Sequence, residues 1–340
     1  MNKILRIFVL FIIVFDFNSC KKSPTDSDTD IQYKYYEGEQ LPNTEIFVPM
    51  GKFYGVPARP IVSPDGLSIA YYKIYTPRDS FGLYLKNLLT SEERFLVKDG
   101  VSPDWSPDGE WIAFCIYPHI YKIKINGDSI IQLTTGEGSF EPVWSPDGKY
   151  LCYGGNTAYN IVSSDGKERK KVGDQYFGAP SDWHPSGTKL LGIRGYSSTS
   201  IWTQFPIFNL VTNTTERILD AAKGYANGVA YYSSDGNRIV FANEKGIWVM
   251  NSDGTALKRI LPNDLSPDRF PDYKGGIKLL LGSASWYPDG KHLIYTHFKV
   301  TRYTIHSLDD ITPEPLVKVE GYMSFYKVNV DSAIAISNLP

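Results

Sequence analysis

The sequence is poor in cysteine, methionine and histidine, and neither sign of charge predominates. Its 340 residues include 3 Cys, 4 Met and 5 His, and 35 Lys and Arg stand against 37 Asp and Glu. The cysteines form no CxxC pair and no Cys/His spacing of the kind found in metal sites. A formal net charge of -2 provides no global basic field for nucleic acid, so any partner must be recognised locally.

Long apolar runs are missing after the N-terminus. Residues 7–15 form an apolar run behind Lys3 and Arg6 that is too short to span a bilayer as a helix. No later segment reaches about 18 uninterrupted apolar residues. Residues 1–19 are therefore predicted to be an export signal, and no other membrane span is predicted.

Cys20 stands at the end of this segment. The four residues FNSC that end at Cys20 resemble the lipobox of bacterial lipoproteins, where a small residue precedes a cysteine that receives lipid. The resemblance implies lipid on Cys20, and an ordinary cleaved signal with an incidental cysteine is the alternative. Residues 20–30 are expected to be a lipidated cysteine and a flexible polar tether. Lys21 and Lys22 replace the Asp that can retain lipoproteins at the inner membrane of some bacteria, which favours the outer membrane.

Aromatic residues, glycine and proline are abundant. The chain has 7 Trp, 24 Tyr, 17 Phe, 29 Gly and 22 Pro, and it is 42% hydrophobic and only 21% charged. Such a chain can bury a large core, which excludes wholesale disorder. Frequent aromatic residues with dense Gly and Pro punctuation favour short strands and turns over long helices.

One phrase recurs six times along the chain. It reads aromatic-Ser-Pro-Asp-Gly, then two variable residues and an alternating apolar strand. Pro presets φ for the first turn residue, Asp bonds its own backbone, and Gly accepts the positive φ that closes a hairpin, so the phrase predicts a strand-turn-strand device and not a catalytic site. The copies are centred on Asp65, Asp108, Asp147, Ser186, Asp235 and Asp289.

The spacing of these copies predicts a β-propeller of four-stranded blades. Successive copies lie 43, 39, 39, 49 and 54 residues apart, close to the length of one blade. Residues 328–337 read as a degraded seventh copy, with Asp331 placed 42 residues after Asp289. Its missing outer strands could come from residues 31–36 and 45–48, which would close the ring. Seven blades are therefore preferred, and six are the alternative.

The repeat resembles the TolB-type, WD40-like propeller repeats of bacterial envelope proteins. The Trp-Ser-Pro-Asp-Gly phrases and the VMNSDG turn of residues 249–254 carry the resemblance, which covers nearly all of residues 31–340. It implies a TolB-like propeller over that range and says little about activity. No α/β domain of the TolB kind precedes the repeats, so the chain looks like a stand-alone propeller lipoprotein.

Packing explains the other conspicuous residues. The tryptophans at positions 105, 144, 183 and 286 are expected to pack between neighbouring blades. Cys115 and Cys152 lie seven and five residues after the turn aspartates of neighbouring repeats, so each faces the same side of its own sheet. Stacked sheets meet by opposite faces, and both cysteines are therefore predicted to be free buried thiols.

Three enzyme classes with propellers can be compared with the sequence. The GYSST string at residues 195–199 lacks the second glycine of a serine nucleophile elbow, and the turn phrase differs from the sialidase Asp-box. Oligogalacturonate lyases resemble this repeat class and use His-rich metal sites. Here His184 and His292 fall at the turns and His306 on a third strand, which leaves only His119 and His297 in loops between second and third strands. We predict no metal and no cofactor.

The face opposite the Asp-Gly turns is the predicted binding surface. It holds the loops between second and third strands and the links between blades, and it is expected to collect aromatic and polar residues such as Arg59, Phe140 and Glu141. Tyr and Arg offer large contact area with polar tips, which suits a protein or glycan surface. The predicted ligand or partner residues are Tyr117, His119, Asn156, Tyr159, Arg194, Tyr196, His297 and Arg302.

The sequence thus predicts a non-catalytic binding or assembly module, anchored by lipid in the bacterial envelope, with an envelope protein or glycan as its partner. The alternative is a carbohydrate-active propeller enzyme, a lyase or glycosidase, with its site at the channel mouth. Such an enzyme needs converging carboxylates or a His/metal cluster there. Glu141 and Asp182, the two inner-strand carboxylates recognised from the sequence, are expected to make hydrogen bonds that lock the blades.

Overall fold

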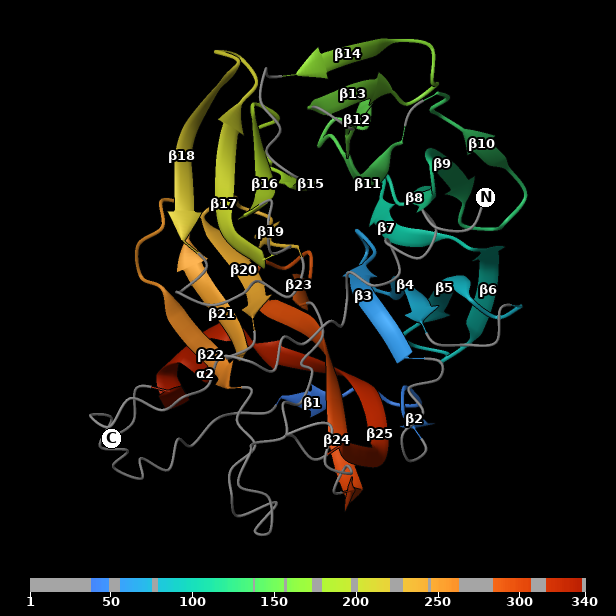
Figure 1. Cartoon of the computed structure of the whole chain (residues 1–340), viewed down its shortest axis with the longest axis vertical. Helices are drawn as coiled ribbons and strands as arrows, with labels where there is room; N and C mark the ends of the chain where they lie inside the picture. The colour runs from blue at the N-terminus through green and yellow to red at the C-terminus, as the bar shows by residue number, and fades with distance from the viewer. Residues whose placement is uncertain are drawn as a thin grey trace.

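The chain forms an all-β propeller of six antiparallel blades around a common centre (Figure 1). The structure is a computed structural model that describes residues 38–48, 56–74, 79–136, 138–155, 158–172, 179–196, 201–220, 229–243, 246–262, 284–306 and 316–337. The predicted signal, Cys20 and the tether lie outside these residues.

Each of the first five blades is a meander of four strands in chain order from the centre outward. Blade 1 comprises β3 (Val56–Val62), β4 (Ser68–Ile74), β5 (Gly82–Asn87) and β6 (Glu93–Lys98). Blade 2 comprises β7 (Val101–Trp105), β8 (Trp111–Ile116), β9 (His119–Lys124) and β10 (Ile130–Gln132). Blade 3 comprises β11 (Phe140–Trp144), β12 (Tyr150–Gly154), β13 (Tyr159–Ser163) and β14 (Arg169–Val172).

Blade 4 comprises β15 (Ala179–Trp183), β16 (Lys189–Tyr196), β17 (Ile201–Asn209) and β18 (Thr214–Asp220). Blade 5 comprises β19 (Tyr231–Tyr232), β20 (Arg238–Asn243), β21 (Gly246–Asn251) and β22 (Lys258–Pro262). The predicted four strands per repeat are thereby confirmed for these blades.

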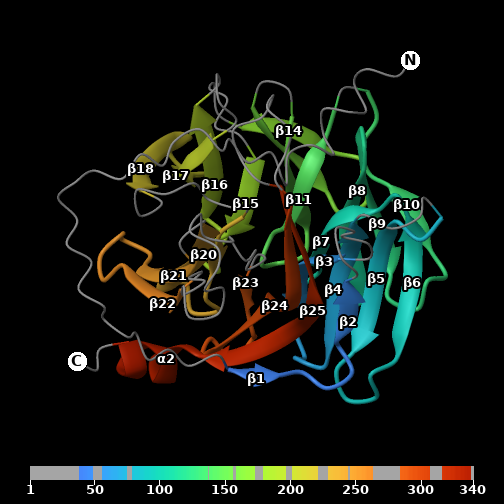
Figure 2. The same ribbon diagram turned by 60° about the horizontal axis from the view of Figure 1, so that its bottom comes forward.

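Blade 6 is built from both ends of the chain, as predicted, and β2 coincides with the expected strand at residues 45–48. The other expected outer strand, residues 31–36, lies outside the described residues. Its inner strands are β23 (Ala284–Trp286), β24 (His292–His306) and β25 (Leu316–Asn329), and its outer edge is β1 (Glu39–Gln40) and β2 (Ile46–Val48). Both N-terminal strands pair antiparallel with β25, and Figure 2 shows β1 beside it. The ring therefore closes with six blades, which was the alternative expectation.

The preferred prediction of a seventh blade is wrong. Residues 328–337 hold the end of β25 and the helix α2 (Val330–Ser337). Asn329 caps this helix, because its side-chain oxygen accepts a hydrogen bond from the Ser332 N–H at 2.9 Å. No helix in the described part of the chain has the length and apolar character needed to cross a membrane.

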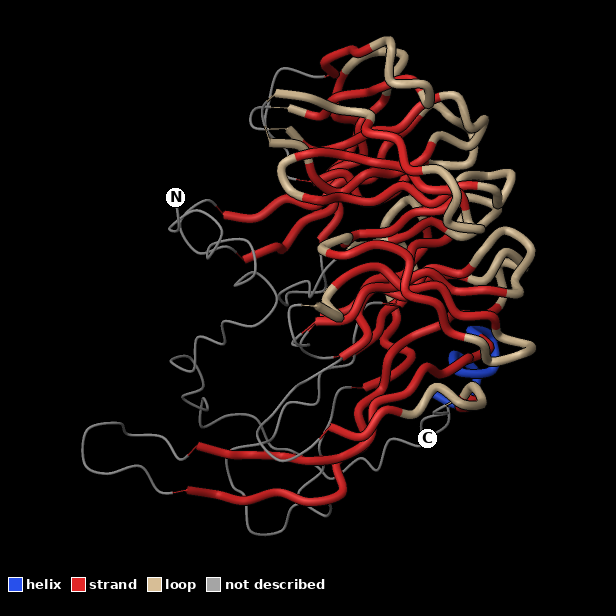
Figure 3. Tube along the Cα trace, turned by 90° about the vertical axis from the view of Figure 1, so that its right-hand side faces the viewer, coloured by secondary structure: helices blue, strands red, loops and turns tan. Residues whose placement is uncertain are grey.

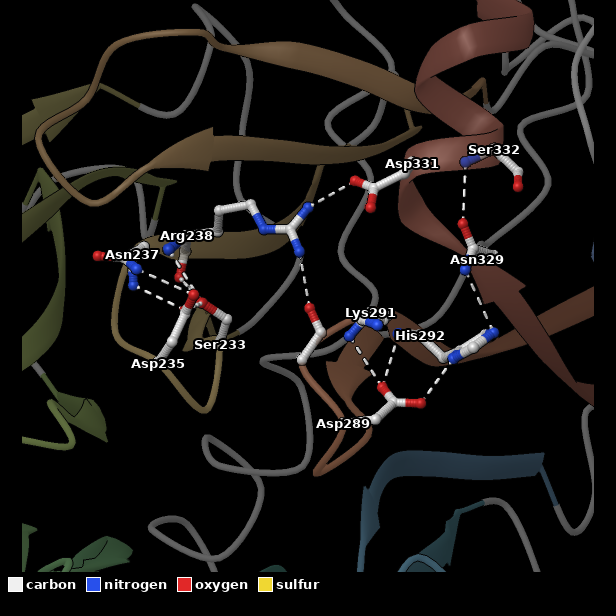
Figure 4. Close-up of polar contacts among 11 residues, drawn as sticks. Ser233, Asp235, Asn237, Arg238, Asp289, Lys291, His292, Asn329, Asp331 and Ser332 are labelled. Atoms are coloured by element: carbon white, nitrogen blue, oxygen red, sulfur yellow. Dashed lines mark hydrogen bonds and ion pairs between the residues drawn. The ribbon is translucent and has the colours of Figure 1, made fainter.

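Arg238 of blade 5 fixes α2 to the ring (Figure 4). Its guanidinium lies 3.0 Å from the Asp331 carboxylate, donates a hydrogen bond of 2.7 Å to the Gly290 carbonyl and stacks 5.1 Å from the centre of the Trp286 ring. Val330 and Ala333 are buried in the core between blades 5 and 6. The helix thus covers the seam between these two blades.

The recurring turns have the geometry that the sequence predicted. In blade 2 the Ser106 hydroxyl donates to Asp108 Oδ1 at 2.5 Å, and the same oxygen accepts the Glu110 N–H at 3.0 Å. Gly109 has φ +72°, which a residue with a side chain rarely adopts. Blade 6 keeps the turn but lacks the serine, and there the His292 ring contacts Asp289 Oδ2 at 2.6 Å instead.

Six hydrophobic clusters fill the six junctions between blades. Trp105, Trp144, Trp183 and Trp286 are all buried in them, as predicted, and Trp105 and Trp286 also donate hydrogen bonds of 3.0 Å to backbone carbonyls of the preceding blade. Cys115 lies between blades 2 and 3 and Cys152 between blades 3 and 4, and both are free buried thiols.

We expect the closure to be sensitive to Thr44, a buried residue just before β2. Its hydroxyl donates to the Leu41 carbonyl at 2.8 Å and accepts the Phe325 N–H at 3.2 Å. Thr44→Val keeps the shape but leaves buried polar groups unpaired, so the free energy of unfolding should fall by about 1–3 kcal/mol in urea titrations. Glu45→Gln, an exposed neighbour, is the control, and equal midpoints for the two variants would contradict this role.

Candidate functional site

The propeller has two faces with different contents. We call the face that carries the Asp-Gly turns the turn face, and the opposite face, which carries the β8–β9 turn and the starts of the inner strands, the mouth face. Figure 3 shows the β24–β25 hairpin extending beyond the other blades on the side away from the turns. β24 has 15 residues where the second strands of the other blades have 5 to 8, and this added length lies toward the mouth face.

The inner strands of blades 1, 2 and 3 each contain a bulge at the mouth end. Arg59, Ser102 and Glu141 occupy equivalent positions in these bulges, with φ of +50°, +55° and +52°. Each is followed by a proline, whose missing N–H suits a point where the ladder is interrupted. A left-handed conformation costs a residue with a side chain about 1–2 kcal/mol, so surrounding contacts must hold all three in place.

Those contacts join the three blades to one another. The Arg59 guanidinium donates a hydrogen bond of 3.2 Å to the Ser102 hydroxyl and forms an ion pair with Glu141 Oε2. Burial by itself would lower the pKa of Arg59, but the Glu141 carboxylate together with Tyr72 and Tyr231 outweighs it, so the pKa lies above its ordinary value. Arg59 is therefore a permanent cation, neutralised by Glu141, on the inner wall of the channel near its mouth.

Two aspartates lie deeper in the inner strands and connect consecutive blades. Asp104 of blade 2 accepts the backbone N–H of Trp144 in blade 3 at 2.6 Å. Asp182 of blade 4 accepts the N–H of Tyr232 in blade 5 at 2.7 Å. The predicted blade-locking role is confirmed for Asp182, whereas Glu141 acts through Arg59. Asp104 was missed, although it precedes its motif tryptophan just as Asp182 does.

Burial changes the protonation of these aspartates. It raises the pKa of Asp104 from 3.8 to about 7, despite hydrogen bonds from backbone N–H groups that act in the opposite direction. Burial and then the nearby Asp104 carboxylate raise the pKa of Asp182 well above its usual range. Tyr231 is close to Arg59 and to both aspartates, and burial raises the pKa of its phenol strongly. Among the described residues, the channel wall thus holds the Arg59–Glu141 ion pair and the carboxyl groups of Asp104 and Asp182, whose pKa values are raised.

Tyr117 lies in the β8–β9 turn on the mouth face, and His119, expected in this loop, is the first residue of β9. Tyr117 is 37% exposed, and the Pro118 carbonyl accepts the Ser139 N–H at 2.8 Å, so the turn adjoins the entry to β11 and Glu141. His119 is half-buried, and its Nδ1 has no hydrogen-bond partner in the described residues. Ligand binding by these two residues stays a prediction.

The other predicted residues are placed differently. Tyr159 is 2% exposed and packs between blades 3 and 4 against Phe208 and Gly192, so it is a core residue and does not lie on the mouth surface. His297 lies within β24, 5.2 Å from the Tyr326 ring, and His306 ends the same strand, so neither has the predicted loop or third-strand position. The long second strand of blade 6 is the reason.

Some predicted residues cannot be placed as side chains. Arg194 and Tyr196 are in β16 and Arg302 is in β24, but only their backbone belongs to the described residues. Asn156 and Cys20 lie outside the described residues altogether. In the part of the chain that the structure describes, no three His, Cys, Asp or Glu side chains are grouped so that they could hold a metal ion.

Comparison with known proteins supports the fold. No protein-family model matches the chain, and no curated protein does so either. Among solved structures, a protein from Agrobacterium tumefaciens assigned as TolB superposes with a TM-score of 0.53 at 16% identity, over 72% of this chain and 96% of that one. An oligogalacturonate lyase from Vibrio parahaemolyticus gives a TM-score of 0.44 at 14% identity, over 77% and 76% of the two chains. The TolB likeness confirms the predicted TolB-like propeller as a fold.

The raised pKa of Asp104 predicts a pH dependence of stability. Between about pH 4 and pH 7 the folded protein retains a proton on Asp104 that the unfolded chain has released, so this stabilisation is present below pH 4 and is lost as the pH rises through 7. As the pH rises across this window, the free energy of unfolding of the wild type should therefore fall relative to that of Asp104→Asn. Asp104 also raises the pKa of Asp182, which adds an effect of the same sign.

The control is Glu110→Gln, an exposed change in the neighbouring turn. Its unfolding free energy should run parallel to that of the wild type from pH 4 to pH 8. If the Asp104→Asn curve is also parallel to the wild type, the aspartate does not titrate in this window and the account of the channel wall fails.

Proposed function

We propose that this protein is a non-catalytic binding or assembly module of the bacterial envelope, anchored by lipid on Cys20, and that its mouth face takes a protein or glycan ligand. The observation that carries the proposal is the engagement of the inner-strand carboxylates. Asp104 and Asp182 accept backbone N–H groups of the next blade, and Glu141 is paired with Arg59. Carboxylates held in this way rigidify the ring, because their oxygens are already engaged by groups of the protein.

Rigidity at the channel mouth favours binding of a large ligand. The Arg59, Ser102 and Glu141 bulges form a fixed polar platform, with the Tyr117 turn beside it. The projecting β24–β25 hairpin stands on the same face, so a partner could contact both the platform and the hairpin. Ordered polar groups and aromatic side chains reduce the entropy that binding must overcome.

An envelope location is supported by two independent features. The sequence carries an export signal followed by the lipobox-like FNSC. The propeller also has the fold of the Agrobacterium protein assigned as TolB, the type of envelope protein that the repeats resemble. We place the protein at the outer membrane because Lys21 and Lys22 follow the lipid-bearing cysteine.

The ligand face is tested by recovering partners from solubilised envelopes. The full-length lipoprotein should co-purify with one stoichiometric partner, and a variant with five mouth-face changes should lose it. The changes are alanine at Tyr117, His119, Arg194, Tyr196 and Arg302. The matched control carries alanine at Glu110, Lys167 and Val211, exposed residues of the turn face, and should keep the partner.

The carbohydrate-active alternative predicts a different outcome. Oligosaccharides incubated with the wild type would be cleaved, and Asp182→Asn together with Glu141→Gln would abolish cleavage while leaving the fold intact. We expect no turnover with either protein and a lower unfolding free energy for the double variant. Cleavage that vanishes in this variant would show that the channel is an active site.

Lipid attachment gives a separate prediction. Cys20→Ser should prevent labelling by a radioactive or clickable fatty acid and shift the protein from the membrane fraction to the soluble fraction of cells. Cys115→Ser and Cys152→Ser, which change buried thiols, should leave both readouts unchanged. Fatty-acid labelling that persists in Cys20→Ser would contradict the proposed anchor.

A further inference from the structure

Blade 1 carries two exposed leucines at the tips of its two turns on the turn face. Leu67 in the β3–β4 turn is 42% exposed, and Leu89 in the β5–β6 turn is 73% exposed. The turns adjoin, because the Leu88 N–H donates to the Leu67 carbonyl at 2.8 Å. The Asn87 side chain accepts the Leu89 N–H at 2.8 Å, which fixes the second turn. Two neighbouring turns of defined geometry thus hold both leucines in water.

The chain enters the propeller beside these turns. β1 pairs with the end of β25 that lies toward the turn face, just before α2. Leu41, directly after β1, is buried in the core between blades 6 and 1, and Leu88 packs against the same core. The Asn43 side chain then donates to the Ser91 hydroxyl at 2.9 Å. The first described residues are therefore fastened to the turn that presents Leu89.

The predicted lipid anchor is close to this corner along the chain. Cys20 lies 18 residues before Gly38, the first described residue, so the intervening chain spans at most about 65 Å. A bilayer that holds the anchor is therefore always within reach of the turn-face end of blade 6. Such a tether raises the effective concentration of the bilayer surface to the order of millimolar, so a contact too weak to recruit a free protein becomes populated.

We propose that the Leu67 and Leu89 tips make a second membrane contact, in which both side chains enter the interface of the bilayer that holds the anchor. The contact rests on the proposed lipid attachment at Cys20. Removal of exposed apolar surface from water supplies the attraction. With the turn face of blade 1 against the bilayer, the mouth face points away from the membrane and stays accessible to its partner.

Charge selects the kind of bilayer. Residues 63–67 and 88–92, which include the two turns, contain Asp65 and Glu92 but no Lys or Arg. Asp65 is held next to the first tip, because its Oδ1 accepts the Leu67 N–H at 2.9 Å. Carboxylates beside the apolar tips repel anionic headgroups. A neutral, zwitterionic phospholipid surface is therefore the expected occupant, and anionic lipid should weaken the contact.

Blade 4 offers a matched control three blades away from blade 1. Val211 in the β17–β18 turn is 76% exposed, and the Asn209 side chain accepts its N–H at 2.8 Å, as Asn87 does for Leu89. The turn geometry and the exposed aliphatic tip are thus the same, but the entry of the chain lies elsewhere. A contact driven by exposed apolar tips alone would use both blades equally.

The test reconstitutes the lipoprotein into phosphatidylcholine liposomes with and without nitroxide-labelled lipid. One NBD fluorophore is attached at Thr90→Cys, next to Leu89, or at Thr212→Cys, next to Val211, while the buried Cys115 and Cys152 stay unlabelled. Nitroxide lipid should quench the probe at position 90 by roughly twofold or more, and the probe at position 212 much less. Phosphatidylglycerol in the liposomes should reduce the quenching at position 90.

Substitutions of the leucines show whether they make the contact. With the probe at position 90, the double variant Leu67→Ser and Leu89→Ser should lose the quenching by nitroxide lipid. Val211→Ser, the matched change in blade 4, should leave that quenching as it was. All three side chains are exposed, so the variants should keep the wild-type midpoint of unfolding in urea.

Flotation on a density gradient separates failure of the contact from failure of the anchor. The wild type should float with the liposomes and Cys20→Ser should not. A wild type that does not float would overturn the anchor and the contact together. Floated protein whose probe at position 90 is not quenched, or is quenched as strongly as the probe at position 212, would overturn the contact alone. Quenching that persists in the double leucine variant would do the same.

Discussion

Closure of the ring is the constraint on which the rest of this structure depends. Each blade buries its two faces against its neighbours, so opening any one junction would expose one apolar face on each of two blades. The last core is made by β25 together with strands from the other end of the chain. Hydrogen bonds add polar specificity to this apolar packing. Aspartate side chains join blade 2 to blade 3 and blade 4 to blade 5. Tryptophan indoles join blade 2 to blade 1 and blade 6 to blade 5.

The channel wall shows how a repeat protein acquires a site. Several inner strands share the bulge position. In blades 1, 2 and 3 it is occupied by Arg59, Ser102 and Glu141, whose side chains contact one another through Arg59. The proposed binding face thus lies where the repeat is locally broken.

The sequence predicted the blades well because the turn chemistry is local. Ser, Pro, Asp and Gly within five residues define a hairpin without help from the rest of the chain. The seventh copy failed for a local reason as well, since Ser332 stands where six other turns have a glycine, and Asn329 caps a helix instead. Local patterns could not predict that Tyr159 is buried or that Arg59 pairs with Glu141. These two features depend on Gly192 of the next blade and on residues 82 positions apart that only the ring brings together.

Construction of blade 6 from both termini has a consequence for the order in which the protein can be completed. Gln40 and Ser324 are 284 residues apart in the chain, yet their side chains are joined by a hydrogen bond of 3.1 Å. During synthesis the first strands to emerge must wait for nearly the last one, because β25 is the partner of both. A ribosome that releases the chain from its N-terminus therefore delivers five stackable blades before any closed ring can exist. The exposed edge persists until the final strand is released, and this is the interval in which a chaperone would be needed.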